Sequence, residues 1–452
     1  MAETKDVIVI GLGVGGEEVA GRCAEAGLEV LGVERNLVGG ECPYWGCIPS
    51  KIAVRAALAV GEAKRIDRLA GSASVDPDWG PVAARIIEAT AWWDDSAAVE
   101  RLERKGVIFV RGEARLVDPG AVEVNGTRYS AERGIVLATG GEPAPPPIEG
   151  LESVAYWTNR EALEATDLPS SLVVLGAGAV GLELAQAFSR LGSRVSVIEA
   201  ADRPLPMEEP ENGRAMSNVL AEDGIELFTG VSASSIRNDK AGVLVELGDG
   251  SVIEGERLLV ATGRRSDLQS LGVENAGLDP SAKHLVVDEH LRVQDGLWGV
   301  GDVTGKAAFT HVAVYQGRVA AADILGENHT PADYSAVPRV TFTDPEVASV
   351  GLTEQQAKDK GLKVRTGTAQ TASSARGWIH GPGAEHGVLK LVADRQGGFL
   401  VGASAMGPSA GEVIGLLIVA VKERIPLANL RELIYPYPTF LRGLEDALRE
   451  LA

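Results

Sequence analysis

The sequence is poor in cysteine and has no long apolar run. Three cysteines among 452 residues exclude the disulfide-rich scaffold of a small secreted protein. The longest apolar stretches, such as VIGLLIVAV at 413–421, are too short to cross a bilayer. The first strand-like segment begins near Asp6, so we expect no signal peptide before it. A cytoplasmic protein is therefore predicted.

Basic residues are also scarce. The chain has 43 lysines and arginines against 63 aspartates and glutamates, which gives a formal net charge of −20. Such a charge disfavours nucleic acid and anionic membrane surfaces as partners, because phosphate binding needs clustered basic side chains. The rest of the composition is that of an ordinary globular protein, with 45% hydrophobic and 23% charged residues. The length suffices for about three domains at roughly 150 residues each.

A strand, a glycine-rich turn and a helix occur in this order twice. After the apolar segment 6–10, the pattern G-x-G-x-x-G is formed by Gly11, Gly13 and Gly16. After the apolar segment 171–175, it is formed by Gly176, Gly178 and Gly181. The next strand of each copy ends in an acid, Glu34 or Glu199, that lies 23 residues after the first glycine.

This repeated pattern is typical of dinucleotide-binding folds. The glycines let the backbone approach a pyrophosphate, the helix N-terminus offers unpaired N–H groups, and the acid binds a ribose hydroxyl. Tight strand–helix turns that bind no nucleotide are the alternative. Two copies with matching acids favour two dinucleotide sites.

Later segments extend the pattern. Two A-T-G segments, VLATGGEP at 136–143 and LVATGRRS at 259–266, follow apolar strands downstream of the two turns. The segment LWGVGDVTG at 297–305 is a further strand that runs into a glycine–aspartate turn. After about residue 336 the sequence changes to strands with turns and then to helices. We expect a separate α+β domain there.

Two of the three cysteines, Cys42 and Cys47, lie in GGECPYWGCIPSK at 39–51. Two cysteines cannot complete a four-ligand zinc site, and no histidine lies near them in the sequence, so no metal site is predicted. Pro49 favours the first turn of a helix, where the helix dipole stabilises a thiolate at Cys47. The segment alone leaves a redox pair and two buried thiols as the open interpretations.

In their order and spacing, the glycine motifs, the cysteine segment and the C-terminal domain resemble the flavoprotein disulfide reductases. This family includes dihydrolipoamide dehydrogenase, glutathione reductase and mercuric reductase. The resemblance covers essentially the whole chain: GVGDV at 299–303 is similar to the family's second flavin contact, and FTDPEVASVGLTE at 342–354 is similar to the start of its dimer-interface domain.

The resemblance implies an α/β fold with two Rossmann-like dinucleotide-binding domains, for FAD and for NAD(P), and a C-terminal α+β dimerisation domain. The implied FAD-binding domain comprises residues 1–150 and 268–335. The NAD(P)-binding domain comprises residues 151–267, and the dimerisation domain comprises residues 336–452. The implied protein partner is a second copy of the chain.

The resemblance also implies which residues bind the cofactors. Glu34 is expected at the adenosine ribose of FAD and Asp302 at its ribityl chain. Glu199, beside a ribose 2′-hydroxyl, favours NADH over NADPH, although Arg203 leaves NADPH open. The other predicted cofactor-binding residues are the six motif glycines, Arg35, Gly40, Ala114, Ala138, Thr139, Gly140 and Gly263.

In this family, electrons pass from the nicotinamide to the flavin, then to the cysteine pair and on to the acceptor. The resemblance assigns Cys47 to the charge-transfer thiolate beside the flavin and Cys42 to the thiol that attacks substrate. Lys51 is expected to pair with Glu183 near the flavin. With Tyr437, these four residues are the predicted catalytic residues.

One family motif is altered. The C-terminal H-P-T-x-x-E, whose histidine protonates the leaving thiolate, corresponds here to YPYPTFLRGLE at 435–445. Tyr437 takes the histidine position and Arg442 the glutamate position. An ordinary tyrosine has a pKa of about 10, against about 6.5 for histidine, so Tyr437 is expected to be a neutral phenol. Arg442 is expected to attract an anionic substrate, to depress the pKa of the phenol, or to pair with Glu445 three residues later. The remaining alternative is that this loop has lost its catalytic role.

The altered motif decides the predicted function. Losing a tuned acid–base group typically costs about 10²–10⁴-fold in rate. We predict an FAD-dependent NAD(P)H oxidoreductase that passes electrons through Cys42 and Cys47 to a small-molecule acceptor other than lipoamide or glutathione.

Three alternatives stay open. Reduced flavin can act directly on quinones or other electrophiles, which need no proton from an imidazole. Metal reduction is another, because mercuric reductases share the tyrosine; they also carry a C-terminal cysteine pair, however, and this sequence has no cysteine after Cys47. The non-enzyme alternative is a redox-sensing flavoprotein without an efficient acceptor.

Overall fold

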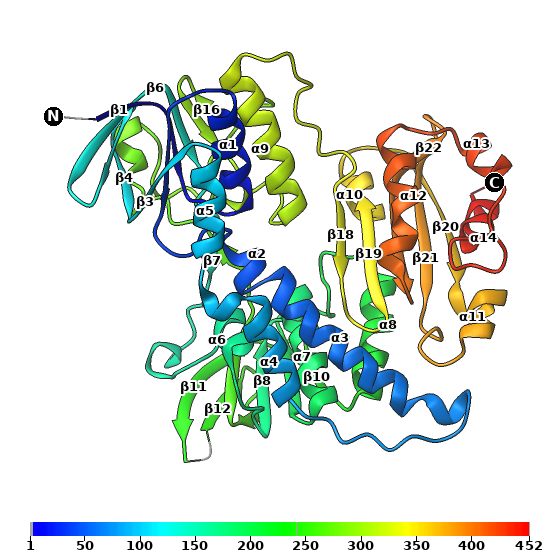
Figure 1. The fold of residues 1–452 in the computed structure, drawn as a ribbon. Coiled ribbons are helices and arrows are strands. Elements are labelled where there is room, and N and C mark those ends of the chain that lie inside the picture. The colour runs from blue at the N-terminus through cyan, green and yellow to red at the C-terminus, as the bar shows by residue number, and fades with distance from the viewer. Residues whose placement is uncertain (1–2, 241, 452) are drawn as a thin grey trace. The chain divides into compact units, whose positions relative to one another are not determined.

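A computed structural model of the protein describes residues 3–240 and 242–451 (Figure 1). The chain divides into two compact units, each made of three stretches. The first comprises Met1–Pro49, Ile86–Ala144 and Gly263–Tyr334, and the second comprises Ser50–Arg85, Pro145–Thr262 and Ser335–Ala452. The domain boundaries given above from the sequence stay a prediction.

An eight-stranded sheet forms the centre of the first unit. Its main order is β16-β17-β6-β1-β2-β3, and β5 pairs with both β6 and β4. The strands are β1 (Glu3–Ile10), β2 (Val30–Glu34), β3 (Val107–Arg111), β4 (Ala114–Asp118), β5 (Ala121–Val124), β6 (Thr127–Leu137), β16 (Arg292–Gln294) and β17 (Leu297–Gly299). Strand β1 is parallel to β2 and β6, and helix α1 (Val14–Glu25) makes the crossover that the parallel pair β1–β2 requires.

Alternate side chains of β1 enter cores on opposite faces of this sheet. Val7 and Val9 share a core with residues of α1 and of α9 (Thr310–Leu325), and Figure 1 shows these two helices side by side. Ile8 and Ile10 belong to the core on the other face. Cys23 of α1 is fully buried in the first core, where burial raises the pKa of its thiol to about 11. This third cysteine is therefore a packing residue.

The second unit contains a four-stranded parallel sheet in the order β10-β9-β8-β14. Its strands are β8 (Ser171–Leu175), β9 (Arg194–Glu199), β10 (Glu226–Thr229) and β14 (Arg257–Val260), connected in part by helices α7 (Ala179–Leu191) and α8 (Pro210–Glu222). A three-stranded antiparallel sheet consists of β11 (Ala233–Asp239), β12 (Gly242–Leu247) and β13 (Val252–Gly255). Val173 and Val245 lie in one core, so the two sheets pack against each other.

The C-terminal part of this unit is a five-stranded antiparallel sheet in the order β18-β19-β22-β21-β20. Its strands are β18 (Pro338–Thr341), β19 (Glu346–Gly351), β20 (Val364–Gln370), β21 (Val388–Asp394) and β22 (Phe399–Gly407). Helix α12 (Ala410–Lys422) packs on β19 and β22, and α14 (Gly443–Glu450) packs on β20 and β21. Leu391, Ile414 and Leu448 are buried in their shared core.

Further elements complete the fold. They are α2 (Glu41–Tyr44), α3 (Cys47–Lys64), α4 (Gly80–Ala89), α5 (Ser96–Arg104), α6 (Asn159–Glu164), α10 (Glu354–Asp359), α11 (Ala375–His380), α13 (Leu427–Glu432), β7 (Glu142–Pro143) and β15 (Arg264–Arg265). No helix within the described residues is long and apolar enough to span a membrane. The predicted fold class, two Rossmann-like domains with a C-terminal α+β domain, is confirmed.

Candidate functional site

The first glycine turn lies between β1 and α1. Gly11 has a φ of +89°, and a Cβ atom on it would lie 2.5 Å from the carbonyl oxygen of Ala138. A Cβ on Gly16 would lie 2.0 Å from the carbonyl oxygen of Gly11, so α1 approaches the turn too closely for a side chain. Gly13 precedes α1 without a side-chain cap, and the nearest atom to a Cβ there would be the Gly40 Cα at 4.0 Å. This open helix N-terminus fits a pyrophosphate.

Glu34 closes this turn from the end of β2. Its Oε2 accepts a hydrogen bond from the backbone N–H of Leu12 at 2.8 Å, and its Oε1 accepts one from Asn36 at 2.7 Å. The side chain is almost buried, so both oxygens need partners. The acid is thus fixed beside the glycine turn, where the sequence predicts the adenosine ribose.

The second glycine turn, between β8 and α7, repeats this geometry. Gly176 has a φ of +102°, and a Cβ on Gly181 would lie 2.0 Å from the Gly176 carbonyl oxygen. Gly178 precedes α7 without a side-chain cap, and a Cβ on it would meet no atom within 4 Å. The residues of both turns therefore fit a dinucleotide, with the open space at the second glycine of each motif.

Glu199 holds the second turn as Glu34 holds the first. Its two oxygens accept hydrogen bonds from the backbone N–H groups of Ala177 at 2.7 Å and Ala201 at 2.8 Å. Arg203, which the sequence left as a candidate phosphate ligand, donates instead to the carbonyl oxygens of Pro206 at 3.1 Å and Glu208 at 3.3 Å. The acid thus lies next to the turn, while the arginine is engaged by backbone.

Several other predicted cofactor residues lie on loops beside the first turn. The Ala138 N–H donates to the Ile10 carbonyl oxygen at 2.8 Å, which brings the segment of Thr139 and Gly140 to the end of β1. Gly40 has a φ of +67°, and a Cβ on it would lie 3.0 Å from the Gly13 Cα. The segments 138–140 and 39–40 therefore both lie against the first glycine turn, where a bound nucleotide would contact their backbone.

Three predicted cofactor residues have separate surroundings. Ala114 is buried at the start of β4. Gly263 has a φ of +127° and precedes β15. Arg35 is more exposed and forms ion pairs with Glu113 and Glu142. Arg35 follows Glu34 directly in the chain, but its ion pairs are with these two acids and not with the glycines of the first turn.

Asp302 lies beside an arginine that the sequence did not single out. Arg264 places Nε 3.9 Å from the Asp302 Oδ2 and Nη1 3.6 Å from the Glu41 Oε2. It also donates to the carbonyl oxygen of Gly141. Burial raises the pKa of Asp302, the positive charge of Arg264 opposes this shift, and the negative charge of Glu41 adds to it. Arg264 therefore joins Asp302 to the residue that precedes Cys42.

The two motif cysteines lie together at consecutive helices. Cys42 belongs to the short helix α2, and Cys47 is the first residue of α3. A hydrogen bond to Cys47 and burial raise the pKa of the Cys42 thiol. The Cys47 sulfur lies 3.2 Å from the Thr310 hydroxyl oxygen, at the start of α9. The structure describes the pair in its thiol form.

Lys51 and Glu183 form an ion pair, with the Lys51 nitrogen 2.6 Å from the Glu183 Oε2. Glu183 is 5% exposed, and its other oxygen accepts a hydrogen bond from the backbone N–H of Phe342 at 2.8 Å. The Lys51 nitrogen also lies 4.8 Å from the centre of the Phe342 ring, within the range of a cation–π contact. The lysine is thus held from two sides.

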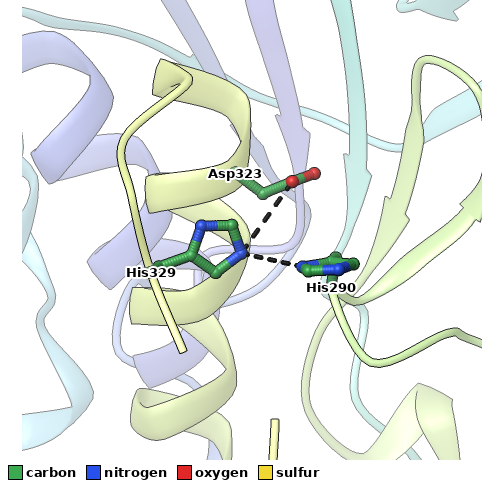
Figure 2. A group of neighbouring side chains, drawn as sticks. All are labelled: His290, Asp323 and His329. Carbon is green, nitrogen blue, oxygen red and sulfur yellow. Dashed lines mark hydrogen bonds and ion pairs between the residues drawn. The ribbon is translucent and has the colours of Figure 1, made fainter. Parts of the chain in front are cut away.

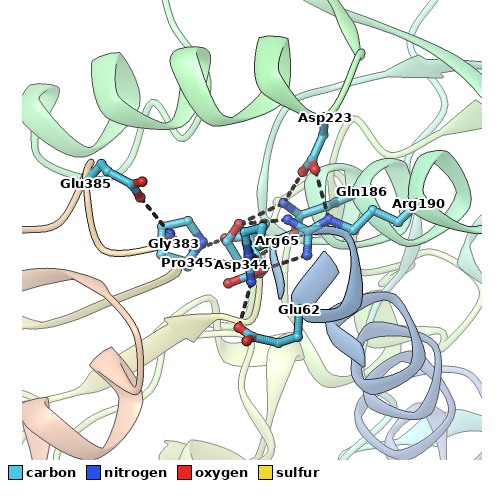
Figure 3. A network of polar contacts seen from close by, with 10 residues as sticks. Glu62, Arg65, Gln186, Arg190, Asp223, Asp344, Pro345, Gly383 and Glu385 are labelled. Atoms are coloured by element: carbon cyan, nitrogen blue, oxygen red, sulfur yellow. Dashed lines mark hydrogen bonds and ion pairs between the residues drawn. The ribbon is translucent and has the colours of Figure 1, made fainter. Parts of the chain in front are cut away.

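The polar face of α7 continues this arrangement to the segment before β19 (Figure 3). Gln186 accepts a hydrogen bond from the Asp344 N–H at 2.7 Å and donates to its carbonyl oxygen at 3.0 Å. The Asp344 carboxylate binds Arg190 at 2.6 Å and Arg65 at 2.8 Å. Residues 183, 186 and 190 lie on one helix face, so one helix fixes both Lys51 and the 342–345 segment.

Tyr437 is 68% exposed. The guanidinium carbon of Arg442 lies 5.1 Å from the centre of its ring, and a nitrogen of Arg442 lies 2.9 Å from the Glu445 Oε2. The expected pairing of Arg442 with Glu445 is therefore present, and its other predicted roles stay predictions. The Arg442 cation lies against the ring of Tyr437. The nearby carboxylate is that of Glu445, three residues after the position of the glutamate in the family motif.

Comparison with known proteins assigns the family. The sequence profile of the pyridine nucleotide-disulphide oxidoreductases matches residues 5–317, and that of the dimerisation domain of the same proteins matches residues 337–448. The chain belongs to this family. Membership makes it a pyridine nucleotide-dependent flavoprotein oxidoreductase with a dimerisation domain.

Relatives within the family have different activities. The chain is 35% identical to a mercuric reductase of Bacillus cereus over 98% of this chain and 71% of the relative. It is also 35% identical to a dihydrolipoyl dehydrogenase of Thermus scotoductus over 99% of this chain and 98% of the relative. The family is therefore certain, and these names do not select one acceptor.

Solved structures agree with the family assignment. The HOCl-induced flavoprotein disulfide reductase RclA from Escherichia coli superposes with a TM-score of 0.86 at 26% identity, over 98% of this chain and 99% of that one. LpdA from Mycobacterium tuberculosis superposes with a TM-score of 0.86 at 27% identity over the full length of both chains.

Some site residues were not found by sequence reasoning. Thr310 beside Cys47, Arg264 beside Asp302 and Phe342 beside Lys51 all come from distant parts of the chain. The segment FTDPEVASVGLTE, in which Phe342 stands first, was used only as a sign of the C-terminal domain. No local spacing marks Thr310 or Arg264 as neighbours of the predicted residues.

Proposed function

We propose that the protein is a homodimeric, NADH-dependent, FAD-containing reductase in the cytoplasm whose Cys42–Cys47 pair is redox-active. Its acceptor is a small molecule other than lipoamide or glutathione. The observation that carries the proposal is the thiol pair, because Cys42 is hydrogen-bonded to Cys47 at the start of α3. Two thiols in such contact are placed to form and break a disulfide.

The cysteine chemistry follows from the hydrogen bond within the pair. When bound, FAD and the nicotinamide nucleotide supply hydride transfer. One hydride equivalent breaks the S–S bond and leaves one proton and one negative charge on the two sulfurs. Because the pKa of Cys42 is raised by its bond to Cys47 and by burial, the proton stays on Cys42 and the charge on Cys47. The Thr310 hydroxyl is near enough to donate a hydrogen bond to that charge.

Lys51 and Glu183 are proposed to align the groups between which hydride is transferred. A buried carboxylate with a backbone partner holds the ammonium group in one place, which is what an oriented hydride transfer requires. Glu34 and Glu199 are proposed to bind the two adenosine riboses. NADH is favoured because Glu199 lies at the second turn and Arg203 is engaged by carbonyl oxygens.

The proposed acceptor class rests on Cys42 and Tyr437. Exchange with a disulfide substrate needs the Cys42 thiolate, and a raised pKa keeps that thiolate scarce at pH 7. The residue at the position of the family's imidazole is Tyr437, a phenol that donates a hydrogen bond but is a poor base. Efficient turnover of lipoamide or glutathione disulfide is therefore not expected.

The second candidate function is direct reduction of quinones or other electrophiles. It is favoured by the same scarcity of the Cys42 thiolate, since such acceptors take electrons without thiol exchange. Metal reduction like that of the mercuric reductases has weaker support, because no cysteine follows Cys47 in this sequence to deliver an ion.

Steady-state assays with NADH and with NADPH test the proposal. The acceptors are lipoamide, glutathione disulfide, a quinone and Hg²⁺. We expect turnover of lipoamide and of glutathione disulfide to be slow with either nucleotide. Fast quinone reduction that survives in Cys42→Ser would favour the second candidate instead. Fast lipoamide turnover would contradict the proposed acceptor class.

Electron transfer from NADH through the flavin to the cysteine pair is tested separately by anaerobic NADH titration. A long-wavelength thiolate-to-flavin absorption band should form in the wild type and should be lost in Cys47→Ser. Its absence from the wild type would contradict the role of Cys47.

A further inference from the structure

Three side chains of the first unit, His290, Asp323 and His329, converge on one another (Figure 2). Asp323 belongs to the last turn of α9, His329 to the loop after it, and His290 to the turn before β16. One donor atom of each residue lies within 4.8 Å of the donor atoms of the other two. The function proposed above gives this cluster no role.

A backbone carbonyl group determines which nitrogen of His329 carries a hydrogen. The His329 Nδ1 lies 3.0 Å from the backbone carbonyl oxygen of Glu327. Because a carbonyl oxygen only accepts, Nδ1 must be the N–H, and Nε2 of the neutral ring presents a lone pair. That lone pair is directed toward the Nδ1 of His290, 3.0 Å away.

The facing atom is the Nδ1 of His290, whose Nε2 lies 3.9 Å from a carboxylate oxygen of Glu289, beyond hydrogen-bond distance. This Nδ1 can carry the hydrogen and donate it to His329, or it can present a lone pair when the hydrogen is on Nε2. In the second tautomer two lone pairs face each other, and a metal ion between them binds both.

The third donor is the carboxylate of Asp323, whose Oδ1 lies 3.9 Å from the His329 Nε2. Both oxygens of this carboxylate accept hydrogen bonds, from the Arg292 guanidinium and from the Trp298 indole N–H. These bonds, from Arg292 at 2.6 and 2.8 Å and from Trp298 at 2.8 Å, are the kind of outer contacts that orient a metal-binding carboxylate.

The distances suit a zinc-type ion. Zinc–nitrogen and zinc–oxygen bonds are about 2.1 Å long and zinc is tetrahedral, so two ligands of one ion lie about 3.4 Å apart. The His290–His329 and His329–Asp323 separations of 3.0 and 3.9 Å lie on either side of this value, and all three atoms lie within 4.8 Å of one another. Small side-chain movements therefore bring the three donors onto one ion. The His290 side chain is 34% exposed and Asp323 is 6% exposed, so an ion reaches the cluster from the His290 side and keeps a water ligand there.

The backbone holds the three donors in place before any ion binds. The Asp288 Oδ1 accepts hydrogen bonds from the N–H groups of His290 at 2.8 Å and Arg292 at 2.9 Å. The Ala332 N–H donates to the Glu289 carbonyl oxygen at 2.7 Å, which ties the loop that carries His329 to the turn that carries His290. Such prior order lowers the entropic cost of binding.

We propose that His290, Asp323 and His329 bind one divalent transition-metal ion of the zinc class. The ligand atoms are His290 Nδ1, His329 Nε2 and Asp323 Oδ1, with water in the remaining position. Two imidazoles and one carboxylate suit Zn²⁺, Ni²⁺ or Cu²⁺ rather than Mg²⁺ or Ca²⁺, which prefer oxygen ligands alone. The ion joins the loop after α9 to the turn before β16.

Zinc binding to the full-length, flavin-loaded protein tests this proposal. Cys42→Ser and Cys47→Ser are introduced in every sample, so that these thiols do not bind the ion. After dialysis against a chelator, zinc stoichiometry and affinity are measured by equilibrium dialysis, and Tm is recorded with and without ZnCl₂. We expect one zinc per chain and a rise in Tm on binding.

Two variants and one control locate the zinc. His329→Gln and His290→Gln should each weaken binding by at least tenfold and remove the rise in Tm. His386→Gln is the matched control, because His386 also contacts a carboxylate, Glu222, but no second imidazole; it should bind as the parent does. Absence of stoichiometric zinc in the parent would overturn the proposal, in favour of a shared proton between the rings. Unchanged affinity in both test variants would also overturn it.

Discussion

Lys51 is anchored by Glu183, whose carboxylate holds the ammonium group at 2.6 Å with one oxygen and a backbone N–H with the other. Replacing Glu183 by Gln keeps the size of the side chain but removes the negative charge that fixes Lys51. We expect the rate of flavin reduction by NADH to fall by about tenfold or more, because orientation of the reacting groups is lost. Anaerobic stopped-flow measurement of flavin bleaching gives this rate.

The control for that experiment is Glu423→Gln, since Glu423 is exposed after α12. It should reduce flavin at the wild-type rate. If Glu183→Asp restores much of the rate that Glu183→Gln loses, the charge is what matters. Equal rates in Glu183→Gln and wild type would show that the pair does not align the reaction.

Tyr437→His should raise turnover of disulfide substrates. An imidazole at this position supplies an acid–base group that titrates near neutral pH, which the phenol does not. We expect a gain of about tenfold, and a larger gain when Arg442→Glu is added to orient the ring. The measurement is kcat/KM for lipoamide, with quinone reduction as the internal control. No gain in either variant would count against the proposed cause of weak disulfide turnover.

The raised pKa of the Cys42 thiol should give disulfide turnover a distinct dependence on pH. Its hydrogen bond to Cys47 and its burial raise its pKa, so below that pKa the thiolate fraction grows about tenfold for each unit of pH. Disulfide turnover should therefore climb steadily from pH 7 to pH 9, while quinone reduction from the flavin should not follow this slope. Cys42→Ser should abolish the first activity and spare the second. Disulfide turnover that survives in Cys42→Ser would exclude the thiol-exchange route.

Glu199 should control the choice of nicotinamide nucleotide. A carboxylate beside the ribose binds the 2′-hydroxyl of NADH and repels the 2′-phosphate of NADPH. We expect kcat/KM for NADH to exceed that for NADPH by at least tenfold, and Glu199→Gln to reduce this ratio. The same change at Glu34, Glu34→Gln, should leave the ratio unaltered. A wild-type preference for NADPH would contradict the assignment.

How much of this was predictable from the sequence depends on the range of the interactions. The glycine turns and their acids follow from local backbone sterics, because only glycine fits where a Cβ would lie 2.0 Å from a carbonyl oxygen. The structure places both turns between a strand and a helix, as the spacing predicts. The pairing of Lys51 with Glu183, across 132 residues, came from the family resemblance and not from any local pattern.

Other contacts depend on tertiary structure and left no trace in the sequence. Thr310 reaches Cys47 because α9 begins beside the cysteine helices. His290 and His329 meet because two loops share a backbone hydrogen bond. Their spacing of 39 residues matches no metal-binding motif, so the sequence gives no sign that the two rings meet.

Asp344 predicts a stability effect. It lies between Arg65 and Arg190 and is itself 13% exposed. Asp344→Asn removes the shared anion, while Arg190 keeps Asp223 and Arg65 keeps Glu62, so we expect a loss of about 2 kcal/mol. Urea unfolding monitored by tryptophan fluorescence measures the loss. Asp118→Asn, at an exposed pair with Arg128, should cost at most about 1 kcal/mol; equal losses in the two variants would refute this estimate.

Helix α7 both begins at the second glycine turn and carries the ion-pair partner of Lys51. It starts at the turn of Gly176, Gly178 and Gly181, the proposed seat of the nicotinamide nucleotide, and two residues later it supplies Glu183, the anchor of Lys51. Any substitution that tilts the helix to accommodate a side chain at Gly181 also moves the partner of the lysine. Glu199 lies at the end of β9, so a substitution there changes coenzyme preference without moving α7. The helix must keep both the glycine turn and the position of Glu183. Lineages that switch coenzyme are expected to change the strand end and to leave α7 intact.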